Sequence, residues 1–218
     1  MTIERIEGRT TRLRRAEVIP EGEMTPRVRA MVAALNGEVE ILRRDLKSAR
    51  DRLAEAERAA DQDQLLPVLN RRAFARALGR HISAMARYGT QASLLYFDLD
   101  GFKRINDAYG HAVGDAVLAH FARLLSANVR DSDSVGRLGG DEFAIVLAHA
   151  SALQATKKAE TLTRMLTTAP AEWNGARIPV SFSYGASEIA GGDSVETALA
   201  RADEAMYAQK RTACSLKP

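Results

Sequence analysis

Cysteine is almost absent from this sequence. The single residue Cys214 excludes a disulfide bond within the chain, and it also excludes a zinc site built from several thiolates. No apolar run approaches the roughly 18 residues of a membrane-spanning helix, and residues 1–15 have no apolar core like that of a signal peptide. We therefore expect a cytoplasmic protein without a membrane span, because free thiols persist in a reducing compartment.

An excess of charge of either sign is also missing. Lysine and arginine number 31 against 28 aspartates and glutamates, which gives a formal net charge of +3. The sequence pI of about 9.2 would be compatible with a nucleic-acid-binding protein. The basic residues, however, form neither a long block nor a stripe interleaved with aromatic residues. Nucleic-acid binding needs clustered phosphate contacts, so we expect no nucleic-acid partner.

Residues 1–25 form a polar arm with five arginines and a proline near its end. Proline disfavours a helix there, and a flexible, solvated arm is the favoured interpretation over a short docking arm. The sequence leaves open whether this arm binds a regulatory protein, a membrane surface or nothing.

Residues 26–62 show the heptad pattern of a coiled coil. Apolar residues step by alternating four and three positions, at Val28, Val32, Leu35, Val39, Leu42, Leu46, Ala49, Leu53, Ala56 and Ala60. The flanking g-to-e′ pairs are all opposite in sign, namely Glu38 with Arg43, Asp45 with Arg50, and Arg52 with Glu57. Such pairs choose partner and direction rather than supply stability. The pattern predicts a homodimer through a parallel coiled coil, the alternative being one amphipathic helix packed on its own domain.

Residues 63–218 alternate between helical and strand patterns. The periodicity predicts helices near 71–88, 115–129, 152–168 and 194–211, with strands at 93–97 and around 180–184. A hairpin is expected over 134–147, turning at Gly139-Gly140, and the Asn174-Gly175 pair predicts a second tight turn. The fold class is therefore α/β (α+β), with a mixed or antiparallel sheet covered by helices.

Acidic residues gather at two points where apolar runs begin or end. Asp98 and Asp100 follow a buried run, and Asp141 and Glu142 follow the glycine pair. A carboxylate at the end of a buried strand is unfavourable unless something compensates it. Each pair alone is typical of a turn or a helix cap. Together they indicate a site for one hard cation, because Mg²⁺ is held by one or two carboxylates plus substrate phosphates.

The residues around these carboxylates resemble the GGDEF-domain family of diguanylate cyclases. The resemblance covers about 63–211, and its motifs are Asn70–Phe74, Asp98–Asp107, Gly110-His111, Gly114-Asp115, Arg137–Phe143 and Ala202–Tyr207. It implies a palm-like fold related to nucleotide cyclases and polymerases. It also implies a nucleotidyltransferase that condenses two GTP into cyclic di-GMP with release of two pyrophosphates.

The resemblance assigns roles to particular residues. Asp98 and Asp141, with the Leu99 carbonyl, would hold Mg²⁺ or Mn²⁺, and the role of Glu142 stays open between metal ligand and base. Asn106 and Asp115 would read guanine; the alternatives are a turn cap for Asn106 and an N-cap of a helix starting at Ala116 for Asp115. The remaining substrate contacts, with Lys103 also in a catalytic role, would come from Phe102, Lys103, Gly139, Gly140, Lys210 and Arg211.

A regulatory site is implied by Arg130 and Asp133, an Arg-x-x-Asp pattern five residues before the glycine pair, at which cyclic di-GMP would act as product inhibitor. Two of the departures from the family pattern concern ligand-binding positions. Thr161 stands where some members have a second arginine for that site, and Cys214 replaces a phosphate-binding arginine, for which Arg211 is a candidate substitute. The alternative functions are a catalytically weak or silent receptor for GTP or cyclic di-GMP, and a coiled-coil scaffold that docks partners.

Overall fold

The computed structural model describes residues 25–215, apart from the side chains of residues 58, 59 and 212–215. The predicted arm lies outside this range except for Thr25, and so does the side chain of Cys214. The chain divides into two compact units, residues 1–56 and 57–218, which we describe separately. No helix in the described range is long and apolar enough to cross a membrane.

The heptad segment forms one continuous helix. Helix α1 (Pro26–Asp61) has 36 residues, which confirms that the segment is helical. Its large apolar side chains are 40% to 65% exposed, at Val28, Met31, Val32, Leu35, Val39, Ile41, Leu42, Leu46 and Leu53. A helix that exposes such a stripe has apolar surface available for a partner.

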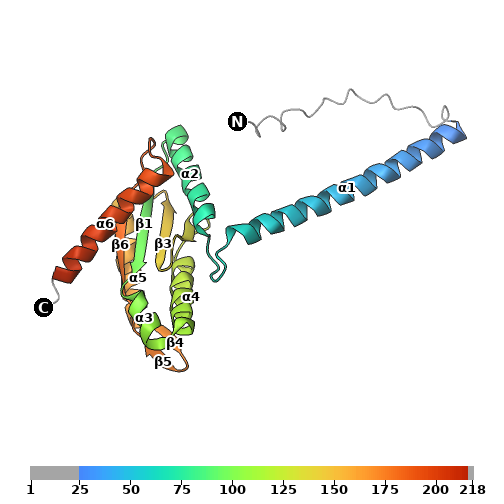
Figure 1. Cartoon of the computed structure of the whole chain (residues 1–218). Helices are drawn as coiled ribbons and strands as arrows, with labels where there is room; N and C mark the ends of the chain where they lie inside the picture. Colours follow the sequence, from blue (N-terminus) through green and yellow to red (C-terminus); the bar gives the residue numbers. More distant parts are fainter. Residues whose placement is uncertain (1–24, 216–218) are drawn as a thin grey trace. The chain divides into compact units, whose positions relative to one another are not determined.

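The globular unit is built on a four-stranded sheet in the order β2-β3-β1-β6 (Figure 1). The strands are β1 (Ala92–Leu99), β2 (Ser134–Arg137), β3 (Glu142–Ala148) and β6 (Phe182–Glu188). Every neighbouring pair is antiparallel. Of the two sheet types expected from the sequence, the antiparallel one is therefore correct.

Helices cover both faces of this sheet. On one face, α2 (Arg71–Tyr88) and α6 (Val195–Ser215) pack on alternate residues of β1 and β3. On the other face, α4 (His111–Ala127) and α5 (Ala152–Thr168) enclose a core with Phe97, Phe121, Phe143 and Phe182, whose contacting rings lie 5.1 to 5.9 Å apart. Because both faces are covered, six successive residues of β1 are buried, and its burial does not alternate.

Local signals fix the ends of several elements. Asn70 caps α2 by accepting from the Ala73 N–H, and Ser151 forms a capping box with Gln154 at the start of α5. Strands β4 (Ala171–Trp173) and β5 (Ala176–Ile178) form the expected small hairpin, because Asn174 and Gly175 both adopt positive φ.

Two features differ from the sequence prediction. A short helix, α3 (Phe102–Tyr109), was not expected, and α4 begins at His111 rather than near 115. Gly110 separates the two helices with φ of 85° and precedes the first residue of α4. The alternative role of Asp115 as an N-cap is therefore wrong, since Asp115 lies inside the helix.

Candidate functional site

Carboxylates from two neighbouring strands meet at one end of the sheet. Asp98, near the end of β1, lies directly opposite Glu142, the first residue of β3. The Leu99 N–H donates to the Asp141 carbonyl over 3.2 Å, which brings the glycine turn against the end of β1. The structure therefore brings together Asp98, Leu99, Asp141 and Glu142.

The charges at this point are only partly balanced. Burial raises the pKa of Asp141, and the negative charge of Asp98 raises it further, against the opposing effects of Lys210 and Arg137. Lys210 reaches from α6 and donates to Asp98 Oδ1 over 2.5 Å. Burial lowers the pKa of Lys210, but its hydrogen bond to Asp98 and the charges of three aspartates outweigh this effect and raise it overall. The site thus concentrates negative charge around one ammonium group.

The donor set fits a hard divalent cation that is shared with a ligand. Among the described residues, no group of three or more His, Cys, Asp or Glu side chains is arranged to hold a metal ion. Asp98 and Asp141 alone would leave most coordination positions to water or ligand oxygens. That division is typical of Mg²⁺, which keeps waters and binds through one or two carboxylates and substrate phosphates.

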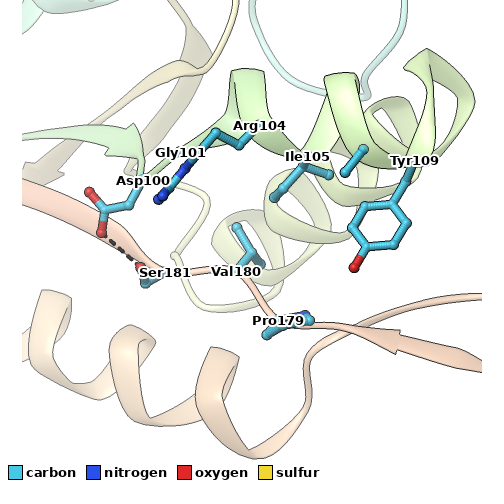
Figure 2. A pocket seen from close by; sticks show the side chains of 9 residues that line it. Asp100, Gly101, Arg104, Ile105, Tyr109, Pro179, Val180 and Ser181 are labelled. Atoms are coloured by element: carbon cyan, nitrogen blue, oxygen red, sulfur yellow. Dashed lines mark hydrogen bonds between the residues drawn. The ribbon is translucent and has the colours of Figure 1, made fainter.

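Asp100 does not join this cluster, although it is two residues from Asp98. Its carboxylate accepts hydrogen bonds from the hydroxyls of Ser181 and Ser183, each over 2.8 Å. Its own N–H donates to the Ser181 carbonyl over 2.9 Å. Figure 2 shows the hydrogen bond between the Ser181 hydroxyl and the Asp100 carboxylate, beside a groove of about 500 Å³ between α3 and residues 179–181. Asp100 therefore ties the start of α3 to the strand β6.

Asn106 carries a buried acceptor that the protein does not satisfy. Its Oδ1 has no hydrogen-bond partner among the described residues. It faces Gly114 on α4 so closely that a Cβ there would lie 1.9 Å from Oδ1. The alternative role as a turn cap finds no support, because only its main-chain carbonyl accepts, from Gly110 N–H. A buried orphan acceptor is rare and suits a ligand donor, and Asp115 is exposed one residue from Gly114.

The N-terminus of α3 lies next to the acidic cluster in the chain. The helix starts at Phe102 after Gly101, without a side-chain cap. The first N–H groups of a helix lack partners within it and favour anions. Lys103 is exposed on this first turn, and Phe102 is half-buried against the core. Arg211 follows Lys210 on α6 with an exposed side chain.

The Arg-x-x-Asp residues form a compact turn. The Arg130 N–H donates to Asp133 Oδ2 over 2.9 Å, and the Ala148 N–H donates to Asp133 Oδ1 over 3.0 Å. Both Asp133 oxygens therefore support the local backbone, as in the plain polar turn. Arg130 is exposed.

Arg137 has a role that the sequence reasoning missed. Its guanidinium donates to the carbonyls of Gly139 and Gly140, at 3.0 and 2.7 Å, and to Asp63 Oδ1 at 3.1 Å. Arg71 adds a bond of 3.0 Å to the Leu138 carbonyl. The only available signal was the position of Arg137 just before the glycine pair.

Known proteins are similar to this chain over the segment that contains the acidic cluster. The family model described as diguanylate cyclase, GGDEF domain, matches residues 60–214. The diguanylate cyclase DosC of Escherichia coli K12 is 41% identical over 150 residues, which are 68% of this chain and 33% of that protein. The response regulator PleD of Caulobacter vibrioides is 36% identical over 164 residues, 74% of this chain and 36% of that protein. The chain spans about a third of the length of these relatives.

Solved structures are also similar. The coiled coil and GGDEF domain of DgcB from Caulobacter crescentus, in complex with c-di-GMP, matches with a TM-score of 0.73 and 26% identity. The match covers 82% of this chain and 95% of that one. Diguanylate cyclase SiaD from Pseudomonas aeruginosa, in complex with its activator SiaC, has a TM-score of 0.73 and 28% identity, and the match covers 85% of this chain and 72% of SiaD.

Proposed function

The chain belongs to the GGDEF-domain diguanylate cyclase family, and from this we propose that it condenses two GTP molecules into cyclic di-GMP with release of two pyrophosphates. The observation that carries the proposal is the meeting of Asp98 and Asp141 at one end of the sheet. The hydrogen bond from Leu99 N–H to the Asp141 carbonyl brings the two strands together there, and Lys210 lies beside both carboxylates. Two relatives with this domain are named diguanylate cyclases, DosC of E. coli and DgcP of Pseudomonas aeruginosa.

We assign the metal site to Asp98, Asp141 and the Leu99 carbonyl, with Mg²⁺ or Mn²⁺ as the cation. When bound, such a cation would neutralise triphosphate charge and ease attack by a 3′-hydroxyl on the α-phosphorus. Lys210 now pairs with Asp98. In the loaded site its ammonium would turn to the terminal phosphates, because the cation would take over the neutralisation of Asp98.

Asn106 and Asp115 would select guanine. The unpaired Oδ1 of Asn106 would accept from the exocyclic amine, and the Asp115 carboxylate would accept from N1–H and N2–H₂. Adenine has neither donor, so binding it would leave both acceptors without a partner, which argues for GTP over ATP.

The phosphates would lie over the glycine turn and the start of α3. Phe102 and Lys103 offer backbone N–H groups of the first helical turn, and Lys103 adds a charge that would stabilise the transition state. Gly139 and Gly140 would allow close approach of the backbone, and Arg211 would supply a second cation from α6.

A single domain supplies one nucleotide and one metal set, whereas closing a cyclic dinucleotide needs two facing half-sites. We assign the pairing to a parallel coiled coil of two α1 helices, because their apolar stripe is exposed and each g-to-e′ pair is opposite in sign. Joining the domains in this way would raise their effective concentration.

Product inhibition is proposed at the Arg130–Asp133 turn. Arg130 is exposed and can donate two hydrogen bonds to guanine O6 and N7. Asp133 holds the turn through both of its oxygens. Its proposed part in binding is therefore mainly to fix the position of Arg130.

The test is GTP turnover with Mg²⁺, followed by pyrophosphate release and by chromatography of the product. Asp141→Ala should abolish turnover, whereas Glu160→Ala, a matched change on the exposed face of α5, should not. Full activity of Asp141→Ala would defeat the site assignment. Binding of cyclic di-GMP without turnover would favour the receptor function, to which the cysteine at position 214 points.

The dimer is tested by removing residues 1–62. A chain starting at Asp63 should lose most activity at low concentration and regain it when two copies are joined artificially. Unchanged specific activity of the truncated chain would reject the half-site arrangement.

A further inference from the structure

Tyr96 places a hydroxyl group inside an apolar layer. It lies in the central strand β1 and is 7% exposed, among Leu94, Ala144, Val146 and Met206. Burying a hydroxyl without a hydrogen-bond partner is unfavourable, and a phenylalanine would fill this space without that penalty. A hydroxyl in this position needs a hydrogen-bond partner, and the strand register offers a candidate.

The antiparallel register puts Tyr96 and Glu142 on the same face of the sheet. Tyr96 lies opposite Ala144, and Asp98 lies opposite Glu142. Since residues two apart project to one face, Glu142 is the diagonal neighbour of Tyr96, within reach of two long side chains. The Glu142 carboxylate is folded under the glycine turn, because a Cβ on Gly139 would lie 2.3 Å from its Oε2.

Across this diagonal the Tyr96 side chain lies within reach of the Glu142 carboxylate, to which its hydroxyl could donate. Burial raises the pKa of Tyr96, and the negative charge of Glu142 raises it further, which is consistent with the two side chains being close. Tyr96 also lines a cavity of about 260 Å³, together with Arg71, Leu138 and Asp203. Arg71 holds the Leu138 carbonyl from the same side. Arg71 therefore supports the backbone of the glycine turn, and Tyr96 is placed to support Glu142 at its start.

We propose that Tyr96 is a positioning residue whose hydroxyl fixes the direction of the Glu142 carboxylate beside Asp98. The inference rests on the proposed function, because Glu142 matters to turnover only if the acidic cluster is a cyclase site. Without the hydroxyl, Glu142 itself is unchanged but its carboxylate loses a hydrogen-bond donor. The carboxylate then samples side-chain rotamers that point away from the reacting groups.

The first experiment compares Tyr96→Phe with Tyr184→Phe. Tyr184 lies on the neighbouring strand opposite Phe97, and its ring packs on the other layer of the fold. Both variants lose one oxygen, but only the first loses contact with Glu142. Tyr96→Phe should lower kcat about tenfold, the value of one hydrogen bond to a charged group, and leave KM for GTP within about twofold. Equal kcat values for the two variants would overturn the inference.

A double-mutant cycle separates positioning from general damage. Glu142→Asp withdraws the carboxylate from Tyr96 by one methylene. If Tyr96 acts through Glu142, adding Tyr96→Phe to this variant should change kcat by less than about twofold. Fully additive losses in the cycle would contradict the mechanism. Activities are compared at a temperature at which all variants are folded by circular dichroism.

A crystal structure of Tyr96→Phe supplies a readout that needs no activity. The Glu142 carboxylate should leave its place under Gly139 in this variant and keep it in Tyr184→Phe. An unmoved carboxylate in Tyr96→Phe would refute the inference even if the unaltered protein turned over no GTP. Absence of turnover in the unaltered protein would instead refute the proposed function, so the two failures are distinguishable.

Discussion

Replacing Arg137 by alanine should loosen the turn that carries Asp141 and destabilise the globular unit. The guanidinium bridges Asp63 to the carbonyls of Gly139 and Gly140. Asp63 uses the same oxygen to accept the Leu65 and Leu66 N–H groups. Arg137→Ala would therefore remove three connections at once and leave a carboxylate without its cation.

The magnitude follows from burial. The two side chains are 16% and 17% exposed, so the pair is mostly shielded from water. Breaking a buried ion pair lowers the free energy of unfolding by about 3–5 kcal/mol. Because this pair is partly exposed, we expect a loss of about 3 kcal/mol. For a domain of this size each kcal/mol shifts Tm by about 2–4 °C, so we expect a fall of about 6–12 °C. Turnover of GTP should fall at least about tenfold, because a displacement of about 1 Å at a reacting group can cost about a hundredfold.

Thermal unfolding followed by circular dichroism, with GTP turnover measured well below Tm, checks both effects. Arg177→Ala is the matched control, because Arg177 is 75% exposed and lies 3.9 Å from Glu172. Such a pair contributes about 0–1 kcal/mol. Arg137→Lys should fall between the two, since an ammonium group cannot reproduce the fork of a guanidinium. If Arg137→Ala unfolded at the same temperature as Arg177→Ala, the bridging role would be refuted.

Three further outcomes follow from single contacts. Gly114→Ala should raise KM for GTP about tenfold by displacing Asn106, whose Oδ1 would lie 1.9 Å from the new Cβ; an unchanged KM would remove Asn106 from the guanine site. Burial, then the Asp98 charge, raises the pKa of Asp141 in the folded protein, so its ionisation reduces stability as pH rises above about 4. Asp141→Asn should therefore raise Tm at pH 7.5 more than at pH 4. An equal rise in Tm at both pH values would contradict a raised pKa of Asp141. The hydrogen bond from Arg201 lowers the pKa of Asp193, so Asp193→Asn should lower Tm at neutral pH, with a difference that narrows as pH falls below about 4.

The sequence predicted best the elements whose ends carry local signals. The bounds expected for the helices 71–88 and 152–168 match α2 and α5, because Asn70 and Ser151 cap them and apolar periodicity runs through each. Helix α3 was missed because it has eight residues, of which Ile105 alone is fully buried. A segment of about two turns with one buried residue shows no periodicity to detect.

The residues of the candidate site were easier to predict than their supports. Asp98 and Asp141 stand beside apolar runs and glycines, which are visible in the chain. Arg137 bonds to Asp63, which is 74 residues away, and the proposed partner of Tyr96 is Glu142, which is 46 residues away. Only the folded turn and the strand register bring these residues together. The dimer, the product site and the cytoplasmic location stay predictions.

The three aspartates at this end of the sheet show why a cation belongs there. Asp100 is satisfied by two serine hydroxyls, and Asp98 is paired with Lys210. Burial and the Asp98 charge raise the pKa of Asp141, so it is the carboxylate least well compensated by the protein. A cation bound between Asp98 and Asp141 would relieve that imbalance and free Lys210 for phosphate. The same electrostatic deficit that lowers stability would therefore create the cation affinity on which the proposed reaction depends.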